Sequence, residues 1–205
     1  MADRPLYLVF AGVNGAGKST LYRSGLWRGP AVPADLPRVN SDEILVARGW
    51  DSADPRAQLR AGREAVALIR GHLAARRSFN QETTLCGHSP LRTIRLARER
   101  GYRVAMHYVG VESPRIANER IAHRAAIGGH FVDPDVVEER WRRSIANLIA
   151  AAPLCDELSL FDNTALLTHV ALLAAGEILE ENADAAAATW HRQVLGALRG
   201  GRGRL

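Results

Sequence analysis

The sequence predicts an α/β fold in which helices cover both faces of a mostly parallel sheet, and three observations lead to this prediction. A continuous apolar run, residues 6–10, ends directly at a glycine-rich segment of the form G-x-x-x-x-G-K-[ST]. Apolar runs typical of buried parallel strands then alternate with segments of helical periodicity. The 205 residues, 47% of them hydrophobic, suffice for one such domain, which we expect to span residues 1–198.

The glycine-rich segment is expected to bind phosphate groups. Its glycines allow successive backbone N–H groups to point inward around phosphate oxygens, and a helix that begins near Lys18 adds the positive end of its dipole. Lys18, the only lysine of the chain, should reach the β- and γ-phosphates, and the Ser19 hydroxyl should ligate Mg²⁺. A strand-to-helix turn without a ligand is the alternative. The predicted nucleotide-binding residues here are Gly12, Asn14, Gly15, Ala16, Gly17, Lys18, Ser19 and Thr20.

Composition narrows the class of protein. No apolar run approaches the roughly 20 residues that a membrane span needs, and residues 1–4 do not begin a signal peptide, so we expect a soluble, cytoplasmic protein without membrane association. Cys86 and Cys155 are too few for a disulfide framework and lack metal-site spacing, which favours reduced, structural thiols. The net charge of +5 fits either nucleic acid or polyanionic small molecules as ligands.

Helices and strands alternate in the first half of the chain. Asn40 is expected to cap a helix whose third residue, Glu43, reaches back to it, so that Asp42 lies at the carboxyl edge of the sheet. Asp54-Pro55 supplies the cap and the first position of a long amphipathic helix. The expected order is a helix over 18–27, a short strand ending at 39, helices from 40 and from 55 to 77, and a strand over 78–82.

The alternation continues into the second half and then changes. A helix over 89–100 and a strand over 103–110 are expected next. An arginine-rich helical pair follows, interrupted at Gly128-Gly129-His130, and we interpret residues 113–149 as a helical lid.

The C-terminal region gives weaker signals. A fifth strand is expected at 158–161. Residues 168–173 and 178–180 fit either a hairpin or a helix, because their alanine content permits both. A last helix over 185–198 should precede a Gly/Arg tail, residues 199–205, which we expect to be disordered.

Two carboxylates, Asp42 and Glu82, follow predicted strands and should therefore point into the crevice at the carboxyl edge of the sheet. Phosphoryl transfer to an alcohol needs a group that orients the hydroxyl and accepts its proton, and Asp42 suits that part. Glu82, followed by Thr83 and Thr84, would hold the acceptor or bind Mg²⁺ through water. Alternatively, Asp42 only offsets the helix dipole as a first-turn acidic residue.

Arginines on the two lid helices form a further candidate group. Arg120 and Arg124 lie four residues apart on one helix, and Arg140, Arg143 and Asn147 share a face of the next. Such arginines could clamp a triphosphate and neutralise the charge that develops during phosphoryl transfer. In an arginine-rich chain the alternative is a solvated helix face.

Taken together, these motifs resemble those of the small zeta-toxin-like kinases. The resemblance covers about residues 5–163 and implies a P-loop NTPase/kinase fold with a five-stranded, mostly parallel sheet of order 2-3-1-4-5 and a helical lid. It rests on five motifs in the expected order: the glycine-rich segment, Asn40-Ser41-Asp42-Glu43-Ile44, Glu82-Thr83-Thr84-Leu85, Arg120 and Arg124 before Gly128-Gly129-His130, and Arg140-Trp141-x-Arg143-Ser144-Ile145-x-Asn147-Leu148.

The resemblance also implies an activity. In that family the aspartate matching Asp42 is the base, the glutamate matching Glu82 binds the acceptor, and arginines matching Arg124 and Arg143 bind phosphate. ATP or GTP with Mg²⁺ is the implied donor, a nucleotide sugar such as UDP-N-acetylglucosamine is the implied acceptor, and an antitoxin protein is a possible partner. Two departures concern the acceptor: Cys86 stands where a serine is expected, and the 205-residue chain is shorter than toxins with extra substrate-binding segments.

Two other functions fit parts of the sequence. One is a kinase for a different small-molecule alcohol. The other is a nucleic-acid-associated ATPase, for which an apolar run ending in Asp-Glu would be expected. The nearest match, residues 158–162, is followed by Asn163, which suits the base pocket of the donor nucleotide better. This disfavours nucleic acid as a partner.

Overall fold

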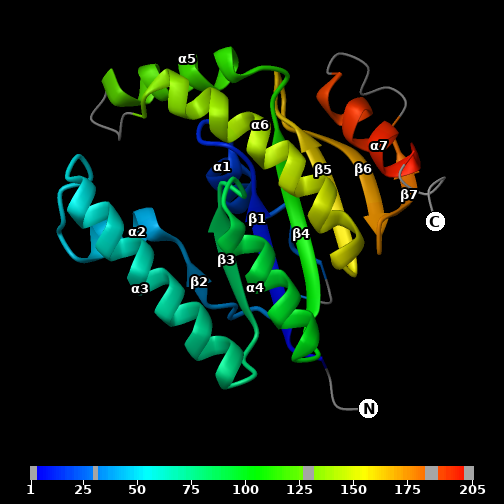
Figure 1. Ribbon diagram of the computed structural model, residues 1–205, viewed down its shortest axis with the longest axis horizontal. Helices are drawn as coiled ribbons and strands as arrows, with labels where there is room; N and C mark the ends of the chain where they lie inside the picture. Colours follow the sequence, from blue (N-terminus) through cyan, green and yellow to red (C-terminus); the bar gives the residue numbers. More distant parts are fainter. Residues whose placement is uncertain (1–3, 30–31, 127–131, 183–188, 201–205) are drawn as a thin grey trace.

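The computed structural model describes residues 4–29, 32–126, 132–182 and 189–200. One seven-stranded sheet runs through it in the order β2-β3-β1-β4-β5-β6-β7, with helices on both sides (Figure 1). The elements are β1 (Leu6–Ala11), α1 (Lys18–Ser24), β2 (Arg38–Val39), α2 (Ser41–Ala47), α3 (Pro55–Ala74), β3 (Phe79–Thr83), α4 (His88–Glu99), β4 (Arg103–Gly110), α5 (Pro114–Ala126), α6 (Pro134–Ala151), β5 (Glu157–Asp162), β6 (Thr168–Ala174), β7 (Glu177–Glu181) and α7 (Trp190–Gly200).

The sheet confirms the predicted order of its first five strands and corrects their number. β2, β3, β1, β4 and β5 are all parallel, in the order 2-3-1-4-5. β6 and β7 add an antiparallel hairpin at the β5 edge, so the sheet has seven strands and not five. Of the two possibilities left open for this region, the hairpin is therefore correct. Ala175 and Gly176 both have positive φ, 49° and 82°, as a two-residue hairpin turn of the favoured type requires.

The side chains of β1 show why its run is continuously apolar. Tyr7 and Val9 belong to the core that includes residues of α3, α4 and α7, whereas Leu8 and Phe10 belong to the core with residues of α1 and α5. All of them are buried. Successive side chains of a strand point to opposite faces, so a central strand covered on both sides needs apolar residues at every position.

Parallel pairing brings the ends of three strands to one edge of the sheet. Phe10 of β1 lies opposite Glu82 of β3, and Val39 of β2 lies opposite Gln81. The segment after β1 and Asn40 therefore reach the same edge as Glu82. This is the edge at which open α/β sheets bind their ligands.

Some predicted boundaries differ from the structure. α1 ends at Ser24 and not near Trp27, because Gly25 adopts a left-handed backbone with φ of 72°. α7 includes Arg199 and Gly200, which the sequence placed in a disordered tail, and Arg199 forms an ion pair with Glu181. The predicted break at 128–130, residues 185–188 of the last helix and tail residues 201–205 lie outside the described residues.

None of the helices among the described residues is long and apolar enough to cross a membrane.

His107 on β4 is a buried polar residue in an aromatic setting. It is 7% exposed and its ring lies between those of Phe10 and Phe161, with centroids at 5.6 and 5.9 Å. Its Nδ1 is buried and has no hydrogen-bond partner among the described residues. Burial, helped by neighbouring His169, lowers the pKa of His107 from 6.5 to about 4. The neutral imidazole is therefore the form that this core accommodates.

The depressed pKa of His107 predicts a specific acid sensitivity. Because the unfolded chain takes up the proton first, His107 contributes stability above pH 6.5 that is lost as the pH falls toward 4. We expect wild type to lose about 2 kcal/mol more unfolding free energy than His107→Phe between pH 7.5 and pH 5. Urea unfolding at both pH values measures this. Equal losses in the two proteins would mean that His107 is not buried as described.

Candidate active site

The glycine-rich segment after β1 forms a turn that leads into α1. Gly17, directly before the helix, has φ of 105°, in the left-handed region that glycine adopts without strain. A Cβ on Gly12 would lie 2.2 Å from the carbonyl oxygen of Val109 on β4, so no larger residue fits there. Ala16 is buried beneath the turn. The predicted strand-turn-helix geometry is thus present in full.

Lys18 is the buried cation of the site. It is only 7% exposed, and its Nζ donates to the carbonyl oxygens of Gly12 at 2.8 Å and Val13 at 3.2 Å. Burial lowers the pKa of the Lys18 ammonium, while the nearby carboxylates of Glu82 and Asp42 counteract that shift. These contacts hold a positive charge at the base of the turn, where an anion would be bound.

One pocket at the carboxyl edge of the sheet gathers most of the predicted site residues. Five of the predicted residues do not line this pocket: Gly12 and Ala16, which are buried, and Thr83, Thr84 and Arg143. The pocket is lined by Asn14, Gly15, Gly17, Lys18, Ser19, Thr20, Arg23, Asp42, Glu82, Arg120, Arg124 and Asn163.

Glu82 is the most connected carboxylate of the pocket. Its side chain is 10% exposed, and both oxygens lie 3.4 Å from the Ser19 hydroxyl. One oxygen is 3.9 Å from Lys18 Nζ. The other accepts hydrogen bonds from Arg38 and from Asn40 Nδ2, the latter at 3.3 Å. The end of β3 is therefore tied to β2 and to the first turn of α1 by one carboxylate.

Asp42 lies in the first turn of α2, as predicted, and is exposed to the pocket. Asn40 caps this helix, because its Oδ1 accepts a hydrogen bond from the Asp42 backbone N–H at 2.9 Å. Glu43 accepts from Asn40 Nδ2 at 3.3 Å and from Arg38 Nε at 2.7 Å. The carboxylate of Asp42 is thus presented to the pocket by a well-capped helix.

Arg120 and Arg124 of α5 both line the pocket. Nη2 of Arg120 donates to the carbonyl oxygen of Thr164 at 3.1 Å. Its Nη1 is buried and has no hydrogen-bond partner among the described residues. A buried guanidinium nitrogen without a partner is costly unless a ligand accepts from it, so Arg120 is suited to bind an anion.

Arg140 and Arg143 of α6 have different contacts. Arg140 donates to Asn14 Oδ1 in the glycine-rich turn at 3.0 Å. Arg143, predicted beside it, pairs with Glu139 on the same helix at 2.7 Å, and its side chain is 64% exposed. The structure therefore brings Arg140 to the turn and leaves Arg143 on the outer side of α6.

Three other predicted residues have defined local contacts. Thr83 Oγ1 accepts from the backbone N–H of Leu85 at 3.1 Å, and Thr84 Oγ1 lies 3.0 Å from Cys86 Sγ. Asn163 Nδ2 donates to the carbonyl oxygen of Ala16 at 2.8 Å. The two threonines shape the loop after β3, and Asn163 supports the glycine-rich turn from the end of β5.

Two arginines of the site, Arg23 and Arg38, are not among the residues predicted from the sequence. Arg23 lines the pocket one turn after Ser19, whose carbonyl oxygen it contacts at 3.2 Å. Arg38 is almost buried, holds Glu82 and Glu43, and lies over the ring of Tyr22 at 3.6 Å. Nothing in their sequence context separates them from the other arginines of the chain.

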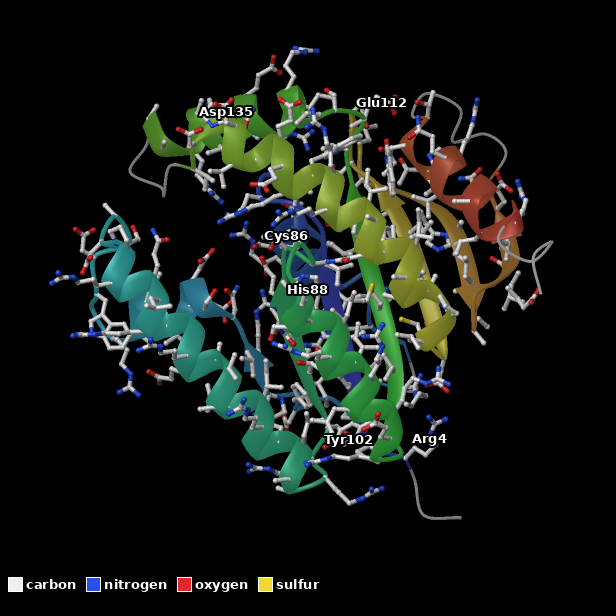
Figure 2. The ribbon with its side chains drawn as sticks, in the orientation of Figure 1. Arg4, Cys86, His88, Tyr102, Glu112 and Asp135 are labelled. Carbon is white, nitrogen blue, oxygen red and sulfur yellow. The ribbon has the colours of Figure 1, made fainter. Side chains whose placement is uncertain are left out.

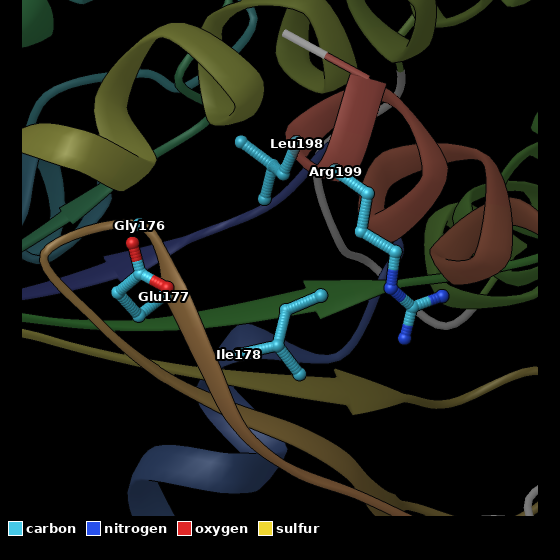
Figure 3. Close-up of a pocket in the computed structure, with 5 residues that line it drawn as sticks. All are labelled: Gly176, Glu177, Ile178, Leu198 and Arg199. Carbon is cyan, nitrogen blue, oxygen red and sulfur yellow. The ribbon is translucent and has the colours of Figure 1, made fainter. Parts of the chain in front are cut away.

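A second hollow lies far along the sheet, between the turn of the β6–β7 hairpin and the end of α7 (Figure 3). Glu177 and Arg199 are its charged residues, and Ile178 and Leu198 its apolar ones. It gathers no group of residues suited to catalysis. The pocket at the glycine-rich turn is therefore the candidate active site.

Two solved structures show a similar fold. One comes from the PezAT chromosomal toxin–antitoxin system of Streptococcus pneumoniae, with a TM-score of 0.62, 16% identity, and coverage of 100% of this chain and 86% of that one. The other is AvrRxo1-ORF1 with AvrRxo1-ORF2 and ATP, with a TM-score of 0.67, 17% identity, and coverage of 95% and 64%. At these identities the likeness concerns the fold.

Sequence comparison identifies a relative and a protein family. An uncharacterized protein of Haemophilus influenzae is 31% identical over 135 residues, which are 65% of this chain and 91% of that protein. The family described as AAA domain matches residues 8–150, which include the glycine-rich turn, Asp42, Glu82 and the arginines of α5 and α6. With most of its length matched, including this pocket, the chain belongs to that AAA domain family.

Proposed function

We propose that this protein is a phosphotransferase that moves the γ-phosphoryl group of ATP or GTP to a hydroxyl of a small molecule. The observation that supports this most is that one pocket contains both a phosphate-binding turn with Lys18 and an exposed carboxylate, Asp42. A nucleotide-binding protein without transfer chemistry needs the first and not the second. The ATP in the AvrRxo1 complex is consistent with a nucleotide donor in this fold.

Each side chain has a part in the proposed reaction. The backbone N–H groups of the turn and Lys18 would hold the β- and γ-phosphates, and Arg120 and Arg124 would neutralise charge on the transferring group. Asp42 would orient the acceptor hydroxyl and accept its proton as the new P–O bond forms. Glu82 would bind the acceptor. Arg143 would take part only if α6 turned its outer side toward the pocket.

The residues present fit a magnesium ion. The Ser19 hydroxyl is an oxygen ligand next to the turn that would hold the phosphates, and the Glu82 carboxylate, 3.4 Å from it, would add negative charge beside the ion. Among the described residues no group of three or more His, Cys, Asp or Glu side chains forms a complete metal site, which suits an ion bound mainly by phosphate and water. When bound, Mg²⁺ would neutralise charge on the phosphates.

The acceptor we propose is a nucleotide sugar such as UDP-N-acetylglucosamine. This rests on the resemblance of the site motifs to zeta-toxin-like kinases and on the fold shared with a toxin–antitoxin protein. The same likeness supports an antitoxin protein as a partner.

Incubation with ATP, Mg²⁺ and matched acceptors tests the proposed function. The set should pair each nucleotide sugar with its free sugar and sugar phosphate, and mass spectrometry should look for a gain of one phosphoryl group. We expect a phosphorylated nucleotide sugar. Phosphorylation of a free sugar instead would retain the kinase and change the acceptor, whereas ATP hydrolysis that no acceptor alters would contradict a kinase.

The assignment of Glu82 to the acceptor gives a separate prediction. Glu82→Gln keeps the size of the side chain but removes the charge that Arg38 and Lys18 contact, so we expect the acceptor KM to rise about tenfold with the ATP KM nearly unchanged. Glu43→Gln is the control, because Glu43 also pairs with Arg38 but does not line the pocket. A higher Mg²⁺ requirement with an unchanged acceptor KM would place Glu82 in the metal shell.

A further inference from the structure

The loop after β3 follows Glu82 closely in sequence and is attached to α6 by one side chain. Nδ2 of Asn147 donates hydrogen bonds to the carbonyl oxygens of Leu85 at 2.7 Å and Gly87 at 3.0 Å. A side-chain amide nitrogen has two hydrogens, so both are used on this loop. Figure 2 labels Cys86 and His88, the sequence neighbours of Gly87, where the chain passes from β3 to α4.

This loop has a backbone that needs external support. Leu85 has φ of 58°, a left-handed conformation that is unfavourable for a residue with a Cβ. Its side chain is fully buried, and its N–H is held by Thr83 Oγ1. The two bonds from Asn147 hold the carbonyl groups of the same turn, and Glu82 lies directly before it.

The same face of α6 reaches the phosphate-binding turn. Positions 140, 144 and 147 are spaced i, i+4 and i+7, so their side chains share one side of the helix. Arg140 contacts Asn14 of the glycine-rich turn, and Ser144 lies 3.0 Å from the Tyr108 hydroxyl of β4. Seven residues of helix span about 10 Å. One helix face therefore contacts the phosphate-binding turn through Arg140 and the loop after β3 through Asn147.

We propose that Asn147 is a positioning residue for the acceptor side of the site. It fixes residues 85–87 to α6, so the helix that also carries Arg140 gives this loop a second connection to the phosphate-binding turn, besides the pairing of β1 with β3. A shift of Arg140 when nucleotide binds is then transmitted to the loop that follows Glu82. This coupling rests on the proposed function, whereas the attachment of the loop by Asn147 does not.

Hydrogen exchange of the full chain, without nucleotide and with ATP and Mg²⁺, tests the proposal. Without nucleotide, we expect amides of residues 83–88 to exchange about tenfold faster in Asn147→Ala than in wild type, with residues 12–20 unchanged. ATP with Mg²⁺ should slow exchange at 12–20 in both proteins, but at 83–88 only in wild type. Asn147→Gln retains both N–H donors and should restore part of the protection.

Ser144→Ala is the matched control. It removes a hydrogen bond from the same face of α6 and touches neither loop, so exchange at 83–88 should stay at the wild-type rate. Unchanged exchange at 83–88 in Asn147→Ala, or equal acceleration in Ser144→Ala, would overturn the proposal. If ATP protects neither segment in wild type, the proposed function is at fault, and the comparison without nucleotide still decides the role of Asn147.

Discussion

Lys18→Ala is expected to abolish phosphoryl transfer, with a loss in kcat/KM of at least about 10³-fold. Lys18 carries the buried cation beside the turn, and the chain has no other lysine. The fold should survive, because burial already disfavours the charged form and lowers the pKa of Lys18. ATP consumption with an active acceptor and thermal unfolding of the same preparation measure the two effects.

Two further substitutions separate charge from shape at this position. Lys18→Met keeps an unbranched side chain without the charge and should be as inactive as alanine. Lys18→Arg keeps the charge but replaces a compact ammonium by a planar group that fits poorly between the carbonyl oxygens of Gly12 and Val13. It should rescue little activity. Wild-type turnover by well-folded Lys18→Ala would rule out this pocket as the active site.

The central part of the fold could be predicted because its signals are local. The apolar residues of β1, the glycine-rich turn and Lys18 at the start of α1 follow one another directly in sequence. Parallel strands then bring Asp42 and Glu82 to the same edge, since Asp42 closely follows β2 and Glu82 lies at the end of β3. For these residues, sequence order and sheet topology together were sufficient.

The β6–β7 hairpin and the orientation of the α6 arginines could not be predicted from local sequence signals. Residues 168–181 are rich in alanine and leucine, which form helices as readily as strands, and only pairing with β5 selects the hairpin. Arg140 and Arg143 differ by one helical turn, yet one contacts Asn14 and the other Glu139. Which side of α6 faces the pocket depends on how the helix packs against the sheet. The positions of the arginines in the sequence do not predict that packing.

The sequence also does not reveal that Arg23 and Arg38 belong to the site. Arg38 is buried by Tyr22 and by two carboxylates from different elements, and these contacts exist only once β2, β3 and α1 are assembled. A chain that uses arginine for nearly all of its cations offers no compositional contrast between a solvated arginine and one in the site. The tertiary contacts alone distinguish them.

Asp42→Asn is expected to lower kcat by about 10² to 10⁴ while nucleotide affinity stays near the wild-type value. The amide is nearly isosteric and can still contact the acceptor hydroxyl, but it cannot accept the proton. Asp42 is exposed, and among the described residues its carboxylate forms no hydrogen bond with the phosphate-binding turn, so only its charge, through Lys18, links it to the donor site. Turnover at saturating donor and acceptor, together with equilibrium nucleotide binding, measures the two quantities.

Asp135→Asn is the matched control for Asp42→Asn, because Asp135 occupies the same position in α6 that Asp42 occupies in α2. Each is the second residue of its helix, with its N–H bonded at 2.9 Å to the side chain of the capping residue, Asp133 or Asn40. Both substitutions remove the same favourable interaction with a helix dipole, worth roughly 0.3–1 kcal/mol. Only Asp42 lines the pocket, so only its substitution should slow turnover. Equal, small effects of both would reduce Asp42 to a helix-stabilising residue and make Glu82 the first alternative base.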